Sequence, residues 1–74
     1  MASKMYYVYV LYSPSHDRTY IGMTVDYGVR LREHNSGRTK STKAFIPWIV
    51  VHLEAYVTRE EARNREKYLK SAAG

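Results

Sequence analysis

Five residues of this chain have the types and spacing that chemistry on a charged substrate requires. Tyr9 and Tyr20 lie in short runs rich in β-branched and aromatic residues. Arg30 and His34 are four residues apart in a segment with helical signals, so they fall on one helix face about a turn apart. Glu66 lies on an apolar helical stripe, where a carboxylate needs a cation or hydrogen-bond donors. These groups can move protons, bind anions and hold metal ions if the fold brings them together.

A predicted β-hairpin positions the two tyrosines. The strand-like runs 7–12 and 19–22 flank a turn-forming cluster of Ser, Pro, His and Asp. A four-residue loop over residues 13–16 places Tyr9 directly opposite Tyr20, on the same face of the sheet. The alternative is that these rings form only an aromatic ladder, which stabilises the sheet by about 0.2 to 1 kcal/mol per cross-strand pair.

Gly22 shares the face that carries Tyr7, Tyr9 and Tyr20. Because glycine has no side chain, this position leaves an opening beside Tyr20 for a backbone or a ligand. We therefore expect a structural role for Gly22.

A helix over residues 27–35 positions Arg30 and His34. Asp26 is a suitable N-cap, and Ser36-Gly37 ends the helical pattern. The alternative interpretation is that Arg30 and His34 form only the solvated side of an amphipathic helix.

Pro47 precedes a third strand over residues 48–56. The run Ile49-Val50-Val51 is apolar on both faces, which favours a central position in the sheet. His52 has no partner in the sequence pattern and is interpreted as packed or solvent-facing.

The last predicted helix begins with a capping box formed by Thr58 and Glu61 and continues through Lys70. Glu66 lies on the stripe that contains Ala62. It therefore either pairs with Lys70, four residues later, or binds a divalent metal.

Composition indicates one domain, residues 1–74, with a polyanionic partner. The chain has 12 Lys and Arg against 7 Asp and Glu, a net charge of +5 and a pI near 9.6, which favours nucleic acid over a membrane surface. Residues 37–43 form an exposed basic loop suited to phosphate oxygens, or alternatively a flexible connector.

Several protein classes are excluded or disfavoured. The absence of cysteine excludes disulfides and thiolate zinc sites, and the three histidines lack metal-motif spacing. There is no apolar run near the roughly 20 residues that span a bilayer. Met1-Ala2-Ser3-Lys4 leads directly into the first strand, so we expect no signal peptide and a cytoplasmic protein.

The order of these motifs resembles the GIY-YIG nuclease family over about residues 5–71. Tyr7-Val8-Tyr9 stands where the family has Gly-Ile-Tyr, and Tyr20-Ile21-Gly22 matches the second motif. Arg30 and His34 match the family's R-x-x-x-H. Further matches are Asn35-Ser36-Gly37, Lys40-Ser41-Thr42-Lys43, Pro47-Trp48 and the helix over residues 61–70.

The resemblance implies an α+β fold, with a three-stranded antiparallel sheet made of the hairpin and the third strand and flanked by helices. It implies a metal-dependent endonuclease that hydrolyses DNA phosphodiesters in repair or recombination. The family's catalytic residues correspond to Tyr9, Tyr20, Arg30, His34 and Glu66. Glu66 is expected to bind Mg²⁺, for which Mn²⁺ can substitute.

Two roles follow from the same resemblance. Arg30 offers a planar fork to the phosphate, and Tyr9, Tyr20 or His34 takes a proton from the attacking water, a choice that the sequence leaves open. The expected contacts to nucleic acid are Arg32, Arg38, Lys40, Ser41, Thr42 and Lys43.

The chain also departs from the family pattern. Tyr7 replaces the first-motif glycine, and the asparagine that family enzymes often carry beyond the glutamate helix is not found before Gly74. Larger relatives owe their target choice to attached DNA-binding domains. We expect none here, and we expect the basic loop, DNA shape, a protein partner or a homodimer to select the substrate. The alternative function is a nucleic-acid-binding module with this fold and little or no activity.

Overall fold

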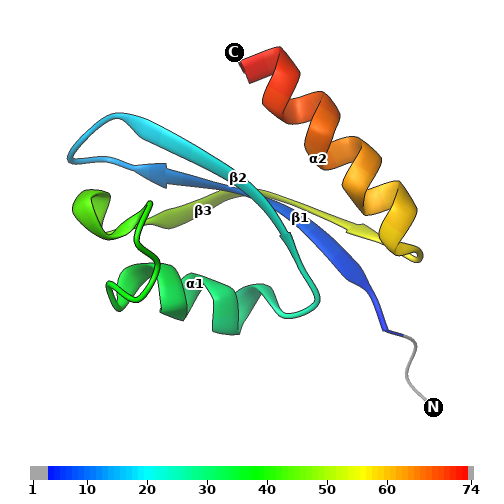
Figure 1. Cartoon of the computed structure of the whole chain (residues 1–74), viewed down its shortest axis with the longest axis horizontal. Helices are drawn as coiled ribbons and strands as arrows, with labels where there is room; N and C mark the ends of the chain where they lie inside the picture. The colour runs from blue at the N-terminus through cyan, green and yellow to red at the C-terminus, as the bar shows by residue number, and fades with distance from the viewer. Residues whose placement is uncertain (1–3, 74) are drawn as a thin grey trace.

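Residues 4–73 are described by a computed structural model, and their backbone follows the predicted order of hairpin, helix, strand and helix. Met1–Ser3, on which the expectation of no signal peptide depends, and Gly74 lie outside the described residues. The elements are β1 (Tyr6–Ser13), β2 (Arg18–Thr24), α1 (Tyr27–Asn35), a short 3-10 helix (Lys43–Phe45), β3 (Ile49–Tyr56) and α2 (Arg59–Ala73). Figure 1 shows α1 and α2 on opposite sides of the sheet. The α+β prediction is therefore confirmed.

The sheet is antiparallel with strand order β2-β1-β3, so the first strand is central. The predicted central position of β3 is wrong. β1 buries Val8 and Leu11 almost completely, whereas Ile49 and Val51 on β3 are about half exposed. An apolar run therefore indicated a strand here but did not determine its place in the sheet.

The hairpin register differs from the prediction by two residues. Ser13 pairs with Arg18, and Tyr9 pairs with Gly22 instead of Tyr20. The reason lies in Asp17, which adopts a positive φ of 50° and accepts a hydrogen bond from the Tyr12 hydroxyl at 2.8 Å, so it belongs to the turn. A shift of two preserves the alternation of side chains, and Tyr9 and Tyr20 still share one face.

The predicted helix caps are confirmed. The Asp26 side chain accepts a hydrogen bond from the Val29 backbone N–H at 3.1 Å, and Gly37 has a positive φ of 83° just beyond α1. Thr58 accepts from the Glu61 backbone N–H at 3.2 Å before α2 begins. α2 continues to Ala73, past the predicted end at Lys70.

The main core lies between the sheet and the side that carries α1. Tyr9, Leu11 and Trp48 are its buried members. Tyr20, Leu31, Phe45 and Val50 pack against them. On the other face of the sheet, Val8 of β1 and Ala62 of α2 are fully buried. No helix among residues 4–73 is long and apolar enough to cross a membrane.

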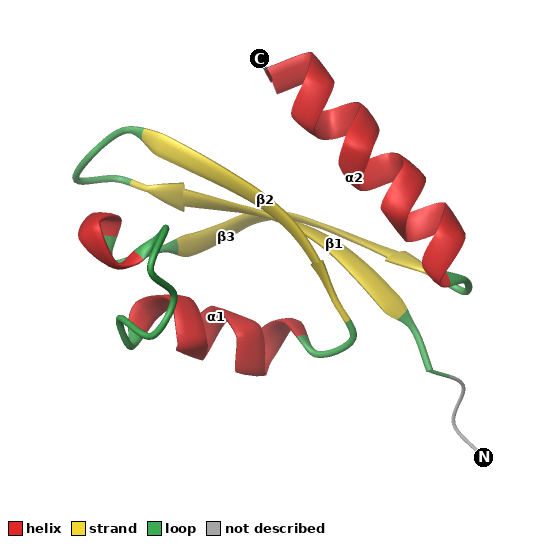
Figure 2. Cartoon of the chain, in the orientation of Figure 1, coloured by secondary structure: helices red, strands yellow, loops and turns green. Residues whose placement is uncertain are grey.

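The segment between α1 and β3 is irregular except for the short 3-10 helix (Figure 2). Trp48 was predicted as the first residue of the third strand, but it precedes β3 and lies in the core. The Asn35 side chain fixes its backbone, accepting from the Trp48 N–H at 2.6 Å and donating to its carbonyl at 3.0 Å. This segment is therefore anchored to the end of α1.

Candidate active site

Tyr9 and His34 meet inside the protein. The Tyr9 hydroxyl lies 3.3 Å from His34 Nε2, joining β1 to α1, and the two side chains are 3% and 0% exposed. The interpretation of His34 as part of a solvated helix face is therefore wrong, because the helix presents this residue to the sheet. A buried hydrogen bond between two titratable groups is the main polar feature of this face.

Thr42 determines which His34 nitrogen carries the proton. His34 Nδ1 lies 2.8 Å from the Thr42 hydroxyl oxygen, and that hydroxyl donates to the Thr39 carbonyl at 3.4 Å. Since a hydroxyl has one hydrogen and this one is directed to Thr39, we infer that His34 Nδ1–H is the donor to Thr42. Nε2 is then the unprotonated nitrogen, and it accepts from the Tyr9 hydroxyl.

Burial and charge set the protonation of this pair. Burial lowers the pKa of His34 below its ordinary value of 6.5, and the nearby positive charge of Arg30 lowers it further. Burial raises the pKa of Tyr9 above its ordinary value of 10, while the Arg30 guanidinium beside the phenol acts in the opposite direction. Both groups are therefore neutral at pH 7.

Arg30 is held at the edge of the site. Its Nη1 donates to Glu33 Oε1 at 3.0 Å, and its side chain is 36% exposed. Glu33 and the Tyr9 hydroxyl both raise the pKa of Arg30, with Glu33 as the larger cause. The guanidinium therefore stays charged and can face both the phenol and solvent.

Tyr20 covers the same pair of rings. Its centroid lies 4.8 Å from that of His34 and 6.3 Å from that of Tyr9, with the two phenol rings stacked at 27°. The predicted proximity of the two tyrosines is confirmed, although they are diagonal neighbours. Tyr20 is half-buried, and its hydroxyl bonds to no other described residue, so it is free to meet a ligand.

Gly22 makes room for the Tyr9 ring. A Cβ at this position would lie 2.5 Å from Tyr9 Cζ and would also overlap the hydroxyl oxygen. The opening predicted at Gly22 thus exists, but it is filled by Tyr9 instead of a ligand. Only glycine allows the phenol to lie across β2 and reach His34.

Glu66 approaches from α2, on the other side of the sheet. Its carboxylate is 17% exposed and pairs with Lys70 at 3.2 Å, the partner that the sequence offered as one of two alternatives. Its charge is near enough to contribute to the raised pKa of Tyr9, although as the smallest cause. Among residues 4–73, no group of three or more His, Cys, Asp or Glu side chains could hold a metal ion.

Most of the predicted nucleic-acid contacts are exposed. Arg32, Arg38, Lys40, Ser41 and Lys43 are on the surface. The prediction of an exposed loop is wrong for Thr42, which is 1% exposed. Besides its bond to His34, Thr42 accepts a hydrogen bond from Trp48 Nε1 at its carbonyl at 2.9 Å, and these two contacts hold it inside.

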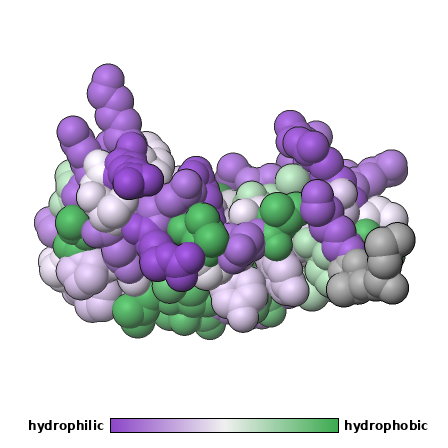
Figure 3. Space-filling model, turned by 90° about the horizontal axis from the view of Figure 1, so that it is seen from below, coloured by the Kyte–Doolittle hydropathy of each residue, from purple (hydrophilic) through white to green (hydrophobic). Residues whose placement is uncertain are grey.

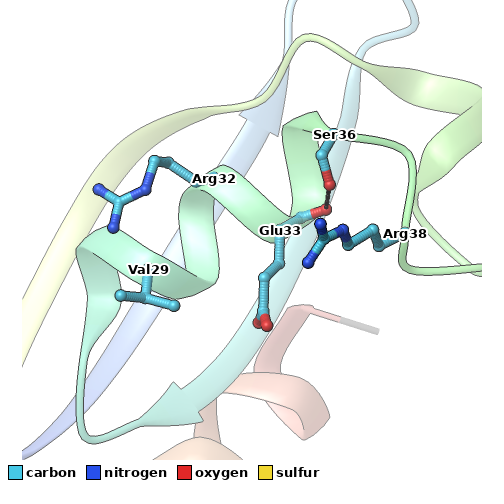
Figure 4. A pocket seen from close by; sticks show the side chains of 5 residues that line it. All are labelled: Val29, Arg32, Glu33, Ser36 and Arg38. Atoms are coloured by element: carbon cyan, nitrogen blue, oxygen red, sulfur yellow. Dashed lines mark hydrogen bonds between the residues drawn. The ribbon is translucent and has the colours of Figure 1, made fainter.

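A surface depression of about 260 Å³ lies along α1. It is lined by Val29, Arg32, Glu33, Ser36 and Arg38 (Figure 4). Figure 4 shows the Arg38 guanidinium beside the stem of the Glu33 side chain, and the Glu33 carboxylate binds Arg30. The depression therefore adjoins the site through Glu33 and carries two of the predicted basic contacts.

The fold and this cluster define a small α+β domain whose sheet face carries tyrosine, histidine and arginine side chains. A family model of the GIY-YIG catalytic domain matches residues 5–74, so the chain belongs to this nuclease family.

Relatives support the same assignment. A UPF0213 protein of Haloquadratum walsbyi is 40% identical over 67 residues, covering 89% of this chain and 74% of that protein. One from Syntrophus aciditrophicus is 42% identical over 67 residues, covering 86% and 75%. One from Streptococcus pneumoniae is 40% identical over 52 residues, and the chain spans about half of its length.

A solved structure has the same fold. The solution NMR structure of a UPF0213 protein from Bacillus halodurans superposes with a TM-score of 0.56 at 32% identity, covering 90% of this chain and 71% of that one.

Proposed function

We propose that this protein is a divalent-metal-dependent DNA endonuclease in which Tyr9 and His34 form a proton relay. The observation that carries the proposal is the buried 3.3 Å contact between the Tyr9 hydroxyl and His34 Nε2, beside Arg30, together with the Thr42 contact from which we assign the proton to Nδ1. An aromatic ladder that only stabilises a sheet needs neither a buried imidazole nor a guanidinium.

His34 is the final proton acceptor in this proposal. It has no exposed surface, whereas Tyr9 keeps 3% of its own exposed and its hydroxyl lies beside the partly exposed Arg30. The attacking water gives a proton to the Tyr9 oxygen while Tyr9 passes its own proton to His34 Nε2. The relay avoids a free phenolate, which the raised pKa of Tyr9 disfavours. It ends on an imidazolium, which burial and Arg30 disfavour in the free protein and which the negative charge of a bound phosphate would favour.

Arg30 and Tyr20 bind the scissile phosphate. The guanidinium of Arg30 presents donors in a plane that matches phosphate oxygens, and it offsets the negative charge that develops during in-line attack. The Tyr20 hydroxyl, which has no partner among the described residues, donates to the same group. Arg32 and Arg38 bind phosphates further along the strand from the depression on α1.

Glu66 is the residue that would hold a metal ion. A single carboxylate fits Mg²⁺, because this ion is commonly bound through one or two carboxylates with waters and substrate phosphates as its other ligands. When bound there, such an ion would supply Lewis-acid chemistry to the phosphate. In the structure, the Lys70 ammonium group provides a positive charge beside this carboxylate.

A nicking assay tests this function. Supercoiled plasmid and a branched DNA junction are incubated with the protein in Mg²⁺, in Mn²⁺ and in chelator. Glu66→Ala is compared with Glu60→Ala, an exposed carboxylate in the first turn of the same helix. We expect metal-dependent nicking by the parent and by Glu60→Ala, and none by Glu66→Ala.

Two results contradict the proposal. If the parent binds both substrates but cleaves neither, the protein is a nucleic-acid-binding module and not a nuclease. Cleavage by Glu66→Ala at the parent rate would remove Glu66 from the metal site.

A further inference from the structure

The outer edge of β3 is open and apolar. β3 pairs with β1 along one edge, and no strand within residues 4–73 pairs with the other. Five of its eight residues are exposed, among them Ile49, Val51 and Leu53 at 47%, 53% and 38%. The strand has a bulge at Val51, but it contains no lysine, arginine or proline, which commonly protect an edge from pairing.

Apolar side chains gather on one side of the surface. In the view from below, hydrophobic residues concentrate along the lower rim, whereas the long hydrophilic side chains project from the upper rim (Figure 3). On a protein with a net charge of +5, this face thus has an apolar rim opposite a polar one (Figure 3).

We propose that the open edge of β3 pairs antiparallel with β3 of a second copy of this chain, so that two three-stranded sheets form one continuous sheet in a symmetric dimer. We assign the pairing strand to a second copy of this chain because the charged and apolar residues of β3 match each other when two copies of the strand lie antiparallel. Lone edge strands of this length and character are also templates for strand addition.

Symmetry restricts the register. The two-fold axis of such a dimer is perpendicular to the sheet, and residues opposite each other must point to the same face. Both conditions hold only in registers where one residue lies opposite the same residue of the other chain, at the two-fold axis. Within the regular part of the strand after the bulge, the central residue is therefore His52, Leu53, Glu54 or a residue nearer the strand end.

The centre at Leu53 is the favourable one. It sets His52 of each copy opposite Glu54 of the other. Just beyond the regular part, it brings the bulge residue Val51 near Ala55. A centre at Glu54 sets two carboxylates opposite each other, which is destabilising, and a centre at His52 opposes two imidazoles. With a centre nearer the strand end, no residue of the partner strand lies opposite Val51, which stays exposed.

Glu54 supplies the negative charge in this register, and within one chain its carboxylate is already bound by Arg65, His52 and Tyr56. Arg65 donates to both of its oxygens at 2.9 and 3.1 Å and holds the pKa of Glu54 at about 2, so the carboxylate is charged at neutral pH. His52 Nε2 already lies 2.6 Å from Glu54 Oε2 within one chain, and its side chain is 50% exposed. Pairing therefore brings each imidazole between two carboxylates.

The dimer would place both Tyr9 sites on the same face of the sheet. The two copies of β1 would lie three strand spacings apart, about 14 Å. Two sites on one face can reach the two strands of one duplex, a consequence that rests on the proposed nuclease function. The dimer itself does not depend on that function.

Cysteine cross-linking tests the register, because the chain has no cysteine of its own. At the two-fold axis, Leu53→Cys places two Cα atoms about 4.5 to 5.5 Å apart, within the range of a disulfide. Val51→Cys controls for the register, since it would lie near Ala55. Val25→Cys controls for exposure, because Val25 is 48% exposed and lies outside the sheet. Light scattering of the parent across a concentration series measures the mass independently of the variants.

We expect the parent to approach twice its monomer mass as concentration rises, and Leu53→Cys to form a covalent dimer at least 10-fold faster than either control. A monomeric mass at every concentration would overturn the dimer. Fastest cross-linking at Val51 would overturn the register, and equal rates at all three positions would overturn pairing through β3. None of these readouts requires nuclease activity.

Discussion

The Tyr9 hydroxyl lies 3.3 Å from Nε2 of His34, although 25 residues separate them in the chain. Three features make this contact possible. Gly22 leaves space for the phenol, α1 turns His34 toward the sheet, and Thr42 holds the imidazole from behind. The candidate site is therefore a property of packing as much as of sequence motifs.

Gly22→Ala tests the packing of Tyr9. The added Cβ would lie 2.5 Å from Tyr9 Cζ, so the ring must move away from His34. We expect a loss of about 1 to 3 kcal/mol in the free energy of unfolding by urea, as in other overpacked cores, together with loss of cleavage. Gly28→Ala is the matched control, because its nearest neighbour would be 3.5 Å away and alanine favours the helix. Equal stability of the two variants would show that Tyr9 does not depend on Gly22.

Thr42→Val tests the orientation of His34. Valine has nearly the same shape but leaves the buried His34 Nδ1–H without its acceptor at 2.8 Å. We expect a loss of about 1 to 3 kcal/mol in unfolding free energy and a slower chemical step with unchanged DNA binding. Thr42→Ser keeps the hydroxyl and should recover the rate. If Thr42→Ser cleaves as slowly as Thr42→Val, the hydroxyl does not act through His34.

The strand faces and the Glu66 stripe were predictable from sequence because each depends on local periodicity. The faces survived a two-residue error in register, since side chains alternate with a period of two. The register itself was missed because Asp17 enters the turn with a positive φ, which its sequence permits but does not require.

Other features depend on tertiary packing. Nothing in the pattern of residues 37–43 distinguishes the buried Thr42 from its exposed neighbours, because its partners His34 and Trp48 come from α1 and from the residue before β3. In the same way, the apolar run of β3 is compatible with an edge strand as well as with a central strand.

Stability should fall in two steps as the pH is lowered. The folded state lowers the pKa of His34, so stability is present above about pH 6.5 and declines as the pH falls below it, because the unfolded chain binds that proton first. The pKa of Glu54 is lowered from 4.5 to about 2, mainly by Arg65, so its contribution is lost between these values. Urea unfolding across a pH series measures both steps.

Glu54→Gln separates the two steps, with the exposed Glu60→Gln as its control. We expect Glu54→Gln to abolish most of the lower step, on the order of 1 to 2 kcal/mol, and to leave the upper one. An unchanged lower step would mean that the Arg65 pair does not stabilise the fold.

The most direct test of the proposed relay is single-turnover cleavage of DNA by Tyr9→Phe, with Tyr7→Phe as the control from the same strand and face. Tyr9→Phe keeps the ring over Gly22 but removes the hydroxyl that contacts His34. We predict a loss of at least about 100-fold in the cleavage rate for Tyr9→Phe, with DNA binding retained and Tyr7→Phe close to the parent. Cleavage by Tyr9→Phe at the parent rate would contradict the relay and with it the proposed mechanism.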